Sequence, residues 1–293
     1  MAAALPKFTF DQFKERFPNE EACLNHLFKI RYSNIAACPN CGKGFDYVRV
    51  VGRRCWQCTQ CSHQLYPTAG TIFHKSTTPM ETWFHVLYMF CITRNGVAAK
   101  EIERSFNVCY RTSLRMAHQF KDLMNSGINE KMTGQIQMDE TFIGGSDTNR
   151  HLNSKAKGKE KTAVFGMLCN DGTAVSDVVP NTKSKTLLPI IQASVERNST
   201  IITDSSQSYY YVWNNFKKHE VVNHLKCEYV NKNGYTTNGM ENYFMHLKRM
   251  IKGTHIQVSE KHLSKYCAEH SFRYTHRNSP DKMFDIALNR LMK

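Results

Sequence analysis

The sequence predicts a mixed α/β protein in which a small cysteine-rich module and a helical region precede a sheet-forming domain. Three observations support this. Four cysteines form two closely spaced pairs near the N-terminus, apolar residues recur at helical spacing between residues 78 and 127, and strand-like and helix-like patterns alternate from residue 131 onward. We therefore expect four segments, at residues 1–37, 38–75, 76–130 and 131–293.

The amino-acid composition limits which cellular environments and which binding partners are expected. Lys and Arg exceed Asp and Glu by 14 in the 293 residues, which is more than solubility requires and favours a polyanionic partner. The first 17 residues lack the apolar core of a signal peptide, and no stretch approaches the ~18 apolar residues of a membrane span. We expect an intracellular chain, in which clustered members of the eleven cysteines bind metal rather than form disulfides.

The first segment is expected to be helical and to provide packing surface. Its apolar residues recur at helical spacing on either side of a break at Pro18: Phe10, Phe13, Phe17, Leu24, Leu27 and Phe28.

Cysteine spacing identifies the second segment. Two C-x₂-C pairs, separated by sixteen residues, have the pattern of paired zinc knuckles: Cys38 and Cys41, then Cys58 and Cys61. Four thiolates give Zn²⁺ a closed tetrahedral site, which is structural rather than catalytic.

Two alternatives stay open for this zinc site. Cys55 and Cys58 also form a C-x₂-C pair and could replace Cys58 and Cys61, and His63 could replace one ligand. We favour Cys58 and Cys61 because residues 62–66 then return to the module as a strand, with Cys55 as a small strand residue.

The third segment contains a candidate helix-turn-helix. A helix that begins at Pro79 is expected to end at Arg94-Asn95-Gly96, and two more helices, Val97–Phe106 and Tyr110–Leu123, flank a tight turn. The last helix presents basic side chains as a major-groove helix does: Arg111, Arg115, His118 and Lys121. Helical hairpins also occur without DNA, but the net charge and the zinc module favour DNA binding through Arg111 and Arg115.

The order of elements characterises the fourth segment. Expected strands are Ile136–Ile143, then Thr162–Cys169 and Thr173–Val179 around the turn Asn170-Asp171-Gly172. There follow a helix at Lys183–Asn198, a strand at Thr200–Thr203, a Tyr-rich helix near Tyr209–Lys217, a strand at Val221–Asn223 and a helix that contains Glu241. Three antiparallel strands followed by alternating helices and strands form a layered sheet. This is the element order of the ribonuclease H fold.

Three acidic residues of this segment carry the candidate chemistry. Asp139 follows a strand-like run, Asp204 ends another strand, and Glu241 lies in a helical run. Carboxylates ~4 Å apart repel by ~4 kcal/mol even at an effective dielectric of ~20, so a cluster of three implies a bound divalent cation. Oxygen ligands favour Mg²⁺ or Mn²⁺ over Zn²⁺, and paired metals held this way drive in-line displacement at phosphorus. The sequence points to an enzyme that cuts and joins DNA.

Each of the three acids alone could be an ordinary solvated residue. A ribonuclease-H-type sheet, however, places the ends of its first and fourth strands side by side beneath its last helix. Glu140 is excluded because it faces away from Asp139 on an alternating strand, and Asp147 and Asp171 because they lie in turns.

Basic residues are expected to contact the DNA backbone in two places. Lys248 follows Glu241 by two helical turns on the same face, with Arg249 and Lys252 close behind, and can hold a phosphate next to the metals. A solvated basic helix face is the alternative. The second place is a lysine-rich run that contains Lys155, Lys157 and Lys159.

The motifs occur in an order that resembles a known family. They are Cys38-Pro-Asn-Cys41, Cys58-Thr-Gln-Cys61, Gly70–Phe73, Met138–Gly145, Thr203-Asp204, Thr237–Phe244, Leu247–Arg249, Ile251–Thr254 and His262-Leu263. From about Phe8 to Arg277 the chain resembles the zinc-ribbon DDE transposases of bacterial insertion sequences, an ISXO-like superfamily related to the eukaryotic Merlin elements. The resemblance implies a ribonuclease H-like catalytic core with a DDE triad at Asp139, Asp204 and Glu241 and a basic partner at Lys248.

The resemblance leaves the third triad residue open. Part of the family uses an Asn there, and Asn242 adjoins Glu241. We favour Glu241 because a carboxylate binds Mg²⁺ more strongly than a neutral amide does. The chain departs from the family pattern at Cys55 and at Ser62, where many relatives have Gly, and neither departure touches the chemistry.

We therefore expect a transposase that binds double-stranded DNA at the terminal inverted repeats of its insertion sequence. With Mg²⁺ or Mn²⁺ it would cleave the ends and transfer them to target DNA, and a structural Zn²⁺ would hold the ribbon. It would act on DNA as a homodimer or higher synaptic assembly and would have no membrane partner. We expect it in the cytoplasm or nucleoid of a bacterium, or in the nucleus of a eukaryotic host. Two alternative functions remain. One is a DNA-binding regulator derived from such an enzyme, and the intact triad argues against it. The other is a nuclease that cuts DNA without joining it.

Overall fold

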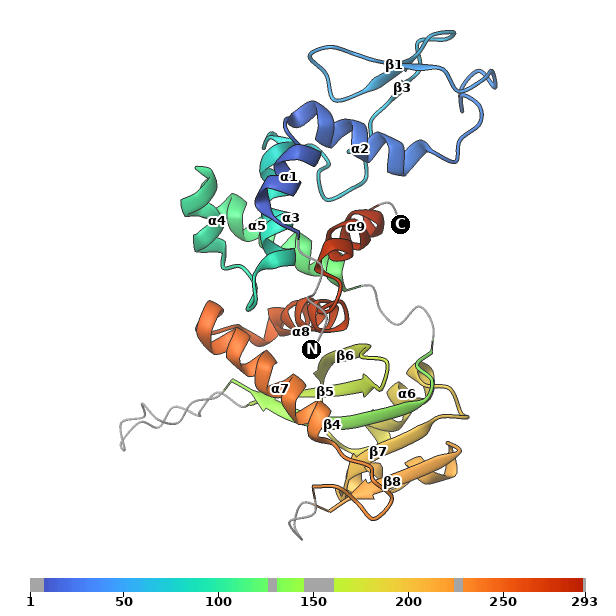
Figure 1. Cartoon of the computed structure of the whole chain (residues 1–293), viewed down its shortest axis with the longest axis vertical. Helices are drawn as coiled ribbons and strands as arrows, with labels where there is room; N and C mark the ends of the chain where they lie inside the picture. The colour runs from blue at the N-terminus through green and yellow to red at the C-terminus, as the bar shows by residue number, and fades with distance from the viewer. Residues whose placement is uncertain (1–7, 126–130, 145–160, 224–228, 292–293) are drawn as a thin grey trace. The chain divides into compact units, whose positions relative to one another are not determined.

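A computed structural model of the chain describes residues 8–125, 131–144, 161–223 and 229–291, which form two compact units (Figure 1). The first unit comprises Met1–Thr93, Ala99–Leu123 and Asn278–Lys293, and the second comprises Arg94–Ala98 and Met124–Arg277. Among the described residues, no helix has both the length and the apolar character needed to cross a membrane.

Two helices open the first unit, α1 (Phe10–Arg16) and α2 (Glu20–Tyr32). The side chains of Thr9 and Asn19 accept hydrogen bonds from backbone N–H groups of the first turns and so cap both helices. The predicted helical entry and its break at Pro18 are confirmed.

Three short antiparallel strands follow: β1 (Tyr47–Arg49), β2 (Trp56–Cys58) and β3 (Gln64–Leu65). The strand predicted over residues 62–66 returns along β2, but only two residues pair. Ser62, directly after Cys61, has a φ of 61°. Glycine adopts this conformation more readily, so Ser62 leaves local strain in the module.

The helices predicted in the third segment are present as α3 (Met80–Ile92), α4 (Ala99–Phe106) and α5 (Tyr110–Met124). Asn107, with a φ of 48°, makes the tight turn between α4 and α5.

Helix α9 (Pro280–Arg290) belongs to the first unit, although the sequence predicts one segment over residues 131–293. The reason is aromatic packing. The ring of Phe284 lies 5.8 Å from that of Phe13 and 5.5 Å from that of Phe17, and its side chain is fully buried.

The second unit is built on a mixed five-stranded sheet in the order β6-β5-β4-β7-β8. Its strands are β4 (Gln135–Ile143), β5 (Thr162–Cys169), β6 (Ala174–Val179), β7 (Thr200–Asp204) and β8 (Lys218–Val222). Strands β4, β5 and β6 are antiparallel neighbours, whereas β7 runs parallel to β4 and to β8. Gly172, with a φ of 94°, lies in the predicted hairpin turn.

Helices cover both faces of this sheet. Helix α6 (Ser184–Ser194) buries Leu187 and Ile191 against one face. Helices α7 (Asn238–Met250) and α8 (Glu260–Thr275) cover the other, and α7 crosses β4 and β5 (Figure 1). The predicted mixed α/β architecture is confirmed.

A buried hydroxyl cluster ties α7 to its neighbours. The Tyr243 hydroxyl lies 2.6 Å from Ser176 Oγ on β6 and 2.8 Å from Ser271 Oγ on α8. Buried polar groups are costly unless they are hydrogen-bonded, so this cluster favours one position of α7 on the sheet.

The Tyr-rich helix predicted near Tyr209–Lys217 is wrong. The segment instead contains two short 3₁₀ turns, η1 (Gln207–Tyr209) and η2 (Val212–Asn214). Tyr209 and Val212 are both buried, and their spacing of three residues suits a 3₁₀ turn. Aromatic and β-branched residues also favour an α-helix only weakly.

Candidate active site and metal centre

Asp139 and Asp204 lie on neighbouring strands. The parallel pairing of β4 with β7 ends where Gln137 lies beside Ile202, and each acid lies two residues beyond this pair on its own strand. Asp139 pairs on its other side with Gly166 of β5. Because side chains alternate along a strand, both acids belong to the sheet face that α7 covers.

Helix α7 approaches this face at two glycines. A Cβ on Gly166 would overlap Met240 Cε and lie 2.9 Å from Phe244 Cζ. A Cβ on Gly239 would lie 2.7 Å from Gln137 Oε1. A side chain at either glycine would therefore displace the side chains packed between α7 and the sheet.

Gln137 fixes the start of α7. Its Oε1 accepts a hydrogen bond of 3.0 Å from the backbone N–H of Met240, the residue before Glu241. The same N–H also donates to the Thr237 carbonyl at 2.9 Å, so the bond is shared between two acceptors, and its contact with Gln137 ties α7 to β4. Gln137 and Asp139 share a strand face, and the contact therefore sets Glu241 relative to Asp139.

A pocket of about 840 Å³ lies in the second unit along β4, α7 and the π-helical turn η4 (Ile251–His255). Its charged lining combines acids and bases: Asp139, Glu140, Glu241, Lys248, Arg249 and Lys252. Asn95 also lines it, and the Asn95 carbonyl accepts a hydrogen bond of 2.8 Å from the Thr254 hydroxyl. The pocket can thus take a ligand that carries both phosphate and cation.

The lining follows a helical stripe. Glu241, Met245, Lys248 and Lys252 are separated by four, three and four residues, so they follow one another along one side of the helix. An acid lies at one end of the stripe and cations at the other.

Burial raises the pKa of Asp139 to about 7, and the charges of Glu140, Asp204 and Glu241 add to this rise. The backbone N–H of Glu140, 2.8 Å from Asp139 Oδ1, opposes it. Asp204 and Glu241 therefore lie within electrostatic range of Asp139. Within the described ranges, however, no three acids bring carboxylate oxygens within 4.8 Å of one another. The three acids are neighbours rather than a closed set of ligands.

Glu140 reaches the pocket lining, but its carboxylate is bound elsewhere. It accepts a hydrogen bond from the hydroxyl of Tyr209, a residue of the core on the α6 side. Burial raises the pKa of Glu140, and the bond from Tyr209 opposes this rise. The side chain thus faces away from Asp139, as the alternation of β4 predicts.

Four cysteines form a metal centre in the first unit. The Sγ atoms of Cys38, Cys41, Cys58 and Cys61 all lie within 4.8 Å of one another. Four thiolates at this spacing are the donor set of a structural Zn²⁺ site.

Neighbouring groups shift the pKa values of these thiols in opposite directions. The backbone N–H of Lys43 lowers the pKa of Cys41, but burial and hydrogen bonds with the other thiols outweigh it and raise this pKa to about 11. Burial opposes ionisation of Cys38, but the Tyr47 hydroxyl, 3.0 Å from its Sγ, and backbone N–H groups outweigh burial and lower the pKa of Cys38 to about 5. Asn40 Nδ2 lies 3.5 Å from Cys61 Sγ. Cys55 is fully buried outside the group, so the structure brings together the four favoured ligands.

The basic residues predicted to bind DNA differ in exposure. Arg111 and Arg115 are exposed on α5, and the Arg115 guanidinium lies 5.6 Å from the Trp83 ring centroid. The prediction of an exposed Lys121 is wrong, since this residue is fully buried with its Nζ 4.6 Å from the Phe90 ring centroid. Its position four residues after the buried Ala117 places it on the core face of α5. Lys155, Lys157 and Lys159 lie outside the described residues.

Sequence patterns missed two residues of this site. The sequence could have indicated Gln137, because it is a polar residue on the face of β4 that packs under a helix. The sequence could not have indicated Asn95 beyond its place at the end of a helix, since only the tertiary fold brings this residue to the pocket.

Known proteins share both regions. Residues 131–275 match the family model of the ISXO2-like transposase domain, and residues 18–64 match that of the transposase zinc-ribbon domain. The chain is also 32% identical over 116 residues to an uncharacterized transposase-like protein of Haemophilus influenzae, a match of 40% of this chain and 90% of that protein. The first match contains the three acids and Lys248, and the second contains the four cysteines.

We expect the purified protein to hold about one tightly bound Zn²⁺, since structural zinc supplies on the order of 10–16 kcal/mol of coupled folding energy in comparable peptides. Cys61→Ser should lose the metal, whereas Cys55→Ala should keep it. Elemental analysis of both variants checks this. Zinc retained by Cys61→Ser and lost by Cys55→Ala would identify Cys55 as the ligand instead.

A second prediction concerns stability and pH. The pKa of an unfolded Asp is near 4, so with a folded pKa of about 7 the folded state of the metal-free protein binds more protons between about pH 4 and pH 7. The free energy of unfolding therefore falls as pH rises through this window. Asp139→Asn removes this loss and should be more stable than the parent at pH 8, by on the order of 1–3 kcal/mol after allowance for partial hydration. Near pH 4 the two should coincide.

Metal provides the control for this second prediction. Mg²⁺ should raise the melting temperature of the parent at pH 8 but not that of Asp139→Asn. Glu140→Gln should keep the Mg²⁺ response, because Glu140 faces the other side of the sheet. Thermal melts of the three proteins with and without Mg²⁺ test this expectation. A Mg²⁺ response lost only in Glu140→Gln would identify Glu140 rather than Asp139 as the metal ligand.

Proposed function

This chain belongs to the ISXO2-like transposases, and we propose that it binds the terminal inverted repeats of its own insertion sequence, cleaves DNA there and joins the cut ends to target DNA. The observation that carries the proposal is the pocket that Asp139 and Glu241 line together with Lys248, Arg249 and Lys252. Few functions need carboxylates and clustered cations in one cavity, and transfer of a phosphoryl group is one of them.

We propose that the second unit is ribonuclease H-like. Three antiparallel strands followed by two parallel ones, with a helix across the first strand, support this assignment. In such a sheet the first and fourth strands are neighbours, as β4 and β7 are here.

The proposed triad is Asp139, Asp204 and Glu241. Its oxygen-only donors suit Mg²⁺ or Mn²⁺, and burial and the neighbouring acids raise the pKa of Asp139, which a bound cation would oppose. When bound, the metal would supply charge neutralisation and activation of a water oxygen. Glu241 is favoured as the third residue because it lines the pocket, whereas Asn242 is not among the described residues that do.

The cations of the pocket would hold the DNA phosphate. Lys248, Arg249 and Lys252 place positive charge along the stripe that begins at Glu241, so a phosphodiester bound to them lies next to the acids. Attack of water at phosphorus releases a 3′-hydroxyl, and attack of that hydroxyl on a target phosphodiester joins the strands. Both steps are direct displacements and need no covalent bond between protein and DNA.

Recognition of the repeats is proposed for the zinc ribbon and for helices α3, α4 and α5 of the first unit. Arg111 and Arg115 are exposed on the helix after the Asn107 turn, in the place of a recognition helix. Lys155, Lys157 and Lys159 would add contacts to phosphates of any sequence. Two transposon ends must meet for transposition, so a homodimer or higher assembly on DNA is proposed as the active form.

The triad can be tested by cleavage of an end-labelled terminal repeat with Mg²⁺ or Mn²⁺. Asp139→Asn, Asp204→Asn and Glu241→Gln should abolish cleavage and strand transfer but retain DNA binding. Asn242→Ala should keep measurable activity. An inactive Asn242→Ala beside an active Glu241→Gln would move the third ligand to Asn242, and a parent that cuts without joining would support the nuclease.

DNA recognition gives a separate expectation. Arg111→Ala should weaken binding to the terminal repeat about 5- to 100-fold and reduce the preference over random duplex, as loss of a base contact of about 1–3 kcal/mol does. Lys157→Ala should weaken both duplexes alike, and Lys14→Ala on α1 should change neither. Fluorescence anisotropy at two salt concentrations measures these affinities. Equal losses on both duplexes for Arg111→Ala would contradict the assignment of α5.

A further inference from the structure

Three aromatic rings are exposed shortly after Asp204 and have no part in the proposed cleavage and joining steps. Tyr210, Tyr211 and Trp213 are 66%, 54% and 58% exposed. Burial of an aromatic side chain contributes about 1.5–3 kcal/mol, so three rings left in water within four residues form an apolar patch of the kind that marks a binding site.

The backbone beneath these rings is held firmly. Tyr209 and Val212 are each 1% exposed, and the Tyr209 hydroxyl donates to Glu140 on β4. Asn215 Nδ2 donates a hydrogen bond of 2.9 Å to the Tyr211 carbonyl, and Gln192 Nε2 of α6 donates one of 2.7 Å to Asn215 Oδ1. Two buried residues and these hydrogen bonds hold the segment, so the rings face outward because of the fold.

The geometry of the rings suits stacking. The ring centroids of Tyr210 and Tyr211 lie 5.2 Å apart with perpendicular planes, so the edge of one ring contacts one face of the other and the two rings are not stacked. A flat aromatic ligand can therefore stack on an exposed face.

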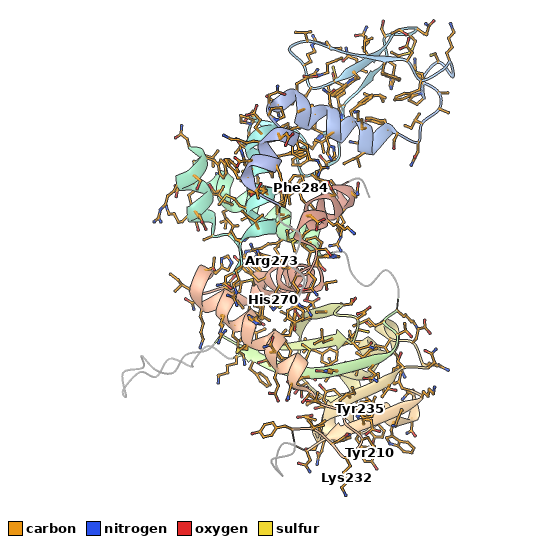
Figure 2. The ribbon with its side chains drawn as sticks, viewed as in Figure 1. Tyr210, Lys232, Tyr235, His270, Arg273 and Phe284 are labelled. Atoms are coloured by element: carbon orange, nitrogen blue, oxygen red, sulfur yellow. The ribbon has the colours of Figure 1, made fainter. Side chains whose placement is uncertain are left out.

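The charges around the rings are positive. Lys217, Lys218 and Lys232 are exposed, and Tyr210 and Lys232 lie at the end of the unit that contains β7 and β8 (Figure 2). Within residues 205–223 and 229–237, Glu220 is the one acid; it is 7% exposed, and Lys218 Nζ lies 2.7 Å from its carboxylate. The exposed side chains of this surface thus offer aromatic faces and cations.

We propose that Tyr210, Tyr211 and Trp213 form a stacking platform for unpaired nucleotides of the DNA strand at the reaction site. The inference rests on the proposed function and deepens it. Aromatic rings beside lysines are the means by which proteins hold single strands without regard to sequence, and each stacked base contributes about 1–3 kcal/mol. Unstacking a base from a duplex costs a few kcal/mol, so the platform would offset most of the energy needed to open a DNA end.

The chain provides its own reporter for this platform. Of its three tryptophans, Trp56 is 5% exposed and Trp83 is 0% exposed, whereas Trp213 is 58% exposed. Titration of the full-length protein without Mg²⁺ with short oligothymidylate should quench tryptophan emission, and a blunt random duplex should quench it far less. Trp213→Phe should abolish the quenching.

Affinities for single-stranded and double-stranded DNA distinguish base stacking from attraction between charges. Trp213→Ala should weaken oligothymidylate binding about 5- to 100-fold, the factor that corresponds to 1–3 kcal/mol, and leave duplex binding unchanged. Trp213→Tyr should retain most of the affinity, because it keeps a ring. Absent quenching, or equal losses on single strand and duplex in a Trp213→Ala protein with a normal melting temperature, would overturn the platform.

Two further measurements distinguish the platform from the cleavage chemistry and from a protein-binding surface. Asp139→Asn should show parental quenching. If the parent itself shows the quenching but never cleaves DNA, the platform is supported and the proposed transposition chemistry fails. If Trp213→Ala changes the oligomeric state in sedimentation while oligothymidylate binding is unaffected, the surface binds a second copy of the chain and the platform is refuted.

Discussion

The close contact of helix α7 with the sheet is the constraint on which the candidate site depends. Two glycines permit it, Gly166 on the strand and Gly239 on the helix, and neither has room for a Cβ. Gln137 then fixes the helix along its axis through the N–H of Met240. The position of Glu241 over β4, and of the cations that follow it, results from this packing rather than from any interaction among the charges. The fold thus holds like charges near one another, although their repulsion opposes it.

The zinc centre and the proposed carboxylate site differ in the ions that they suit. The ribbon offers four thiolates, which suit Zn²⁺, whereas the pocket offers carboxylates, which suit Mg²⁺ or Mn²⁺. Hydrogen bonds outweigh burial and lower the pKa of Cys38 to about 5, whereas burial and hydrogen bonds among the thiols raise that of Cys41 to about 11. The pKa of Asp139 is about 7, and near neutral pH a proton therefore competes with a cation for this carboxylate. We therefore expect zinc to stabilise the first unit permanently, and the proposed carboxylate site to respond to pH and to metal.

Local patterns predicted most of the elements, because helices and strands with one buried face carry their periodicity in the sequence. The hairpin around Gly172, the strand that contains Asp139 and the helix that contains Glu241 were all found in this way. Tertiary packing decided the remainder. Phe284 draws the last helix into the first unit, and Lys121 is buried over an aromatic ring although its charge predicts exposure. For the candidate site, sequence spacing predicted that Glu241 and the basic residues lie on one side of a helix. The role of Gln137 in positioning that helix was evident only from the three-dimensional contact.

The proposed chemistry requires that carboxylates from β4, β7 and α7 share a catalytic divalent cation. Anomalous scattering from Mn²⁺ in crystals of the full chain is the sharpest test, because the ion is located without reference to activity. We expect a Mn²⁺ peak within coordination distance of Asp139, Asp204 and Glu241, on the side of the sheet that α7 covers. A peak bound by Asn242 in place of Glu241 would correct one ligand. A peak bound by Glu140 on the opposite face, or no peak near Asp139 at saturating Mn²⁺, would contradict the shared site.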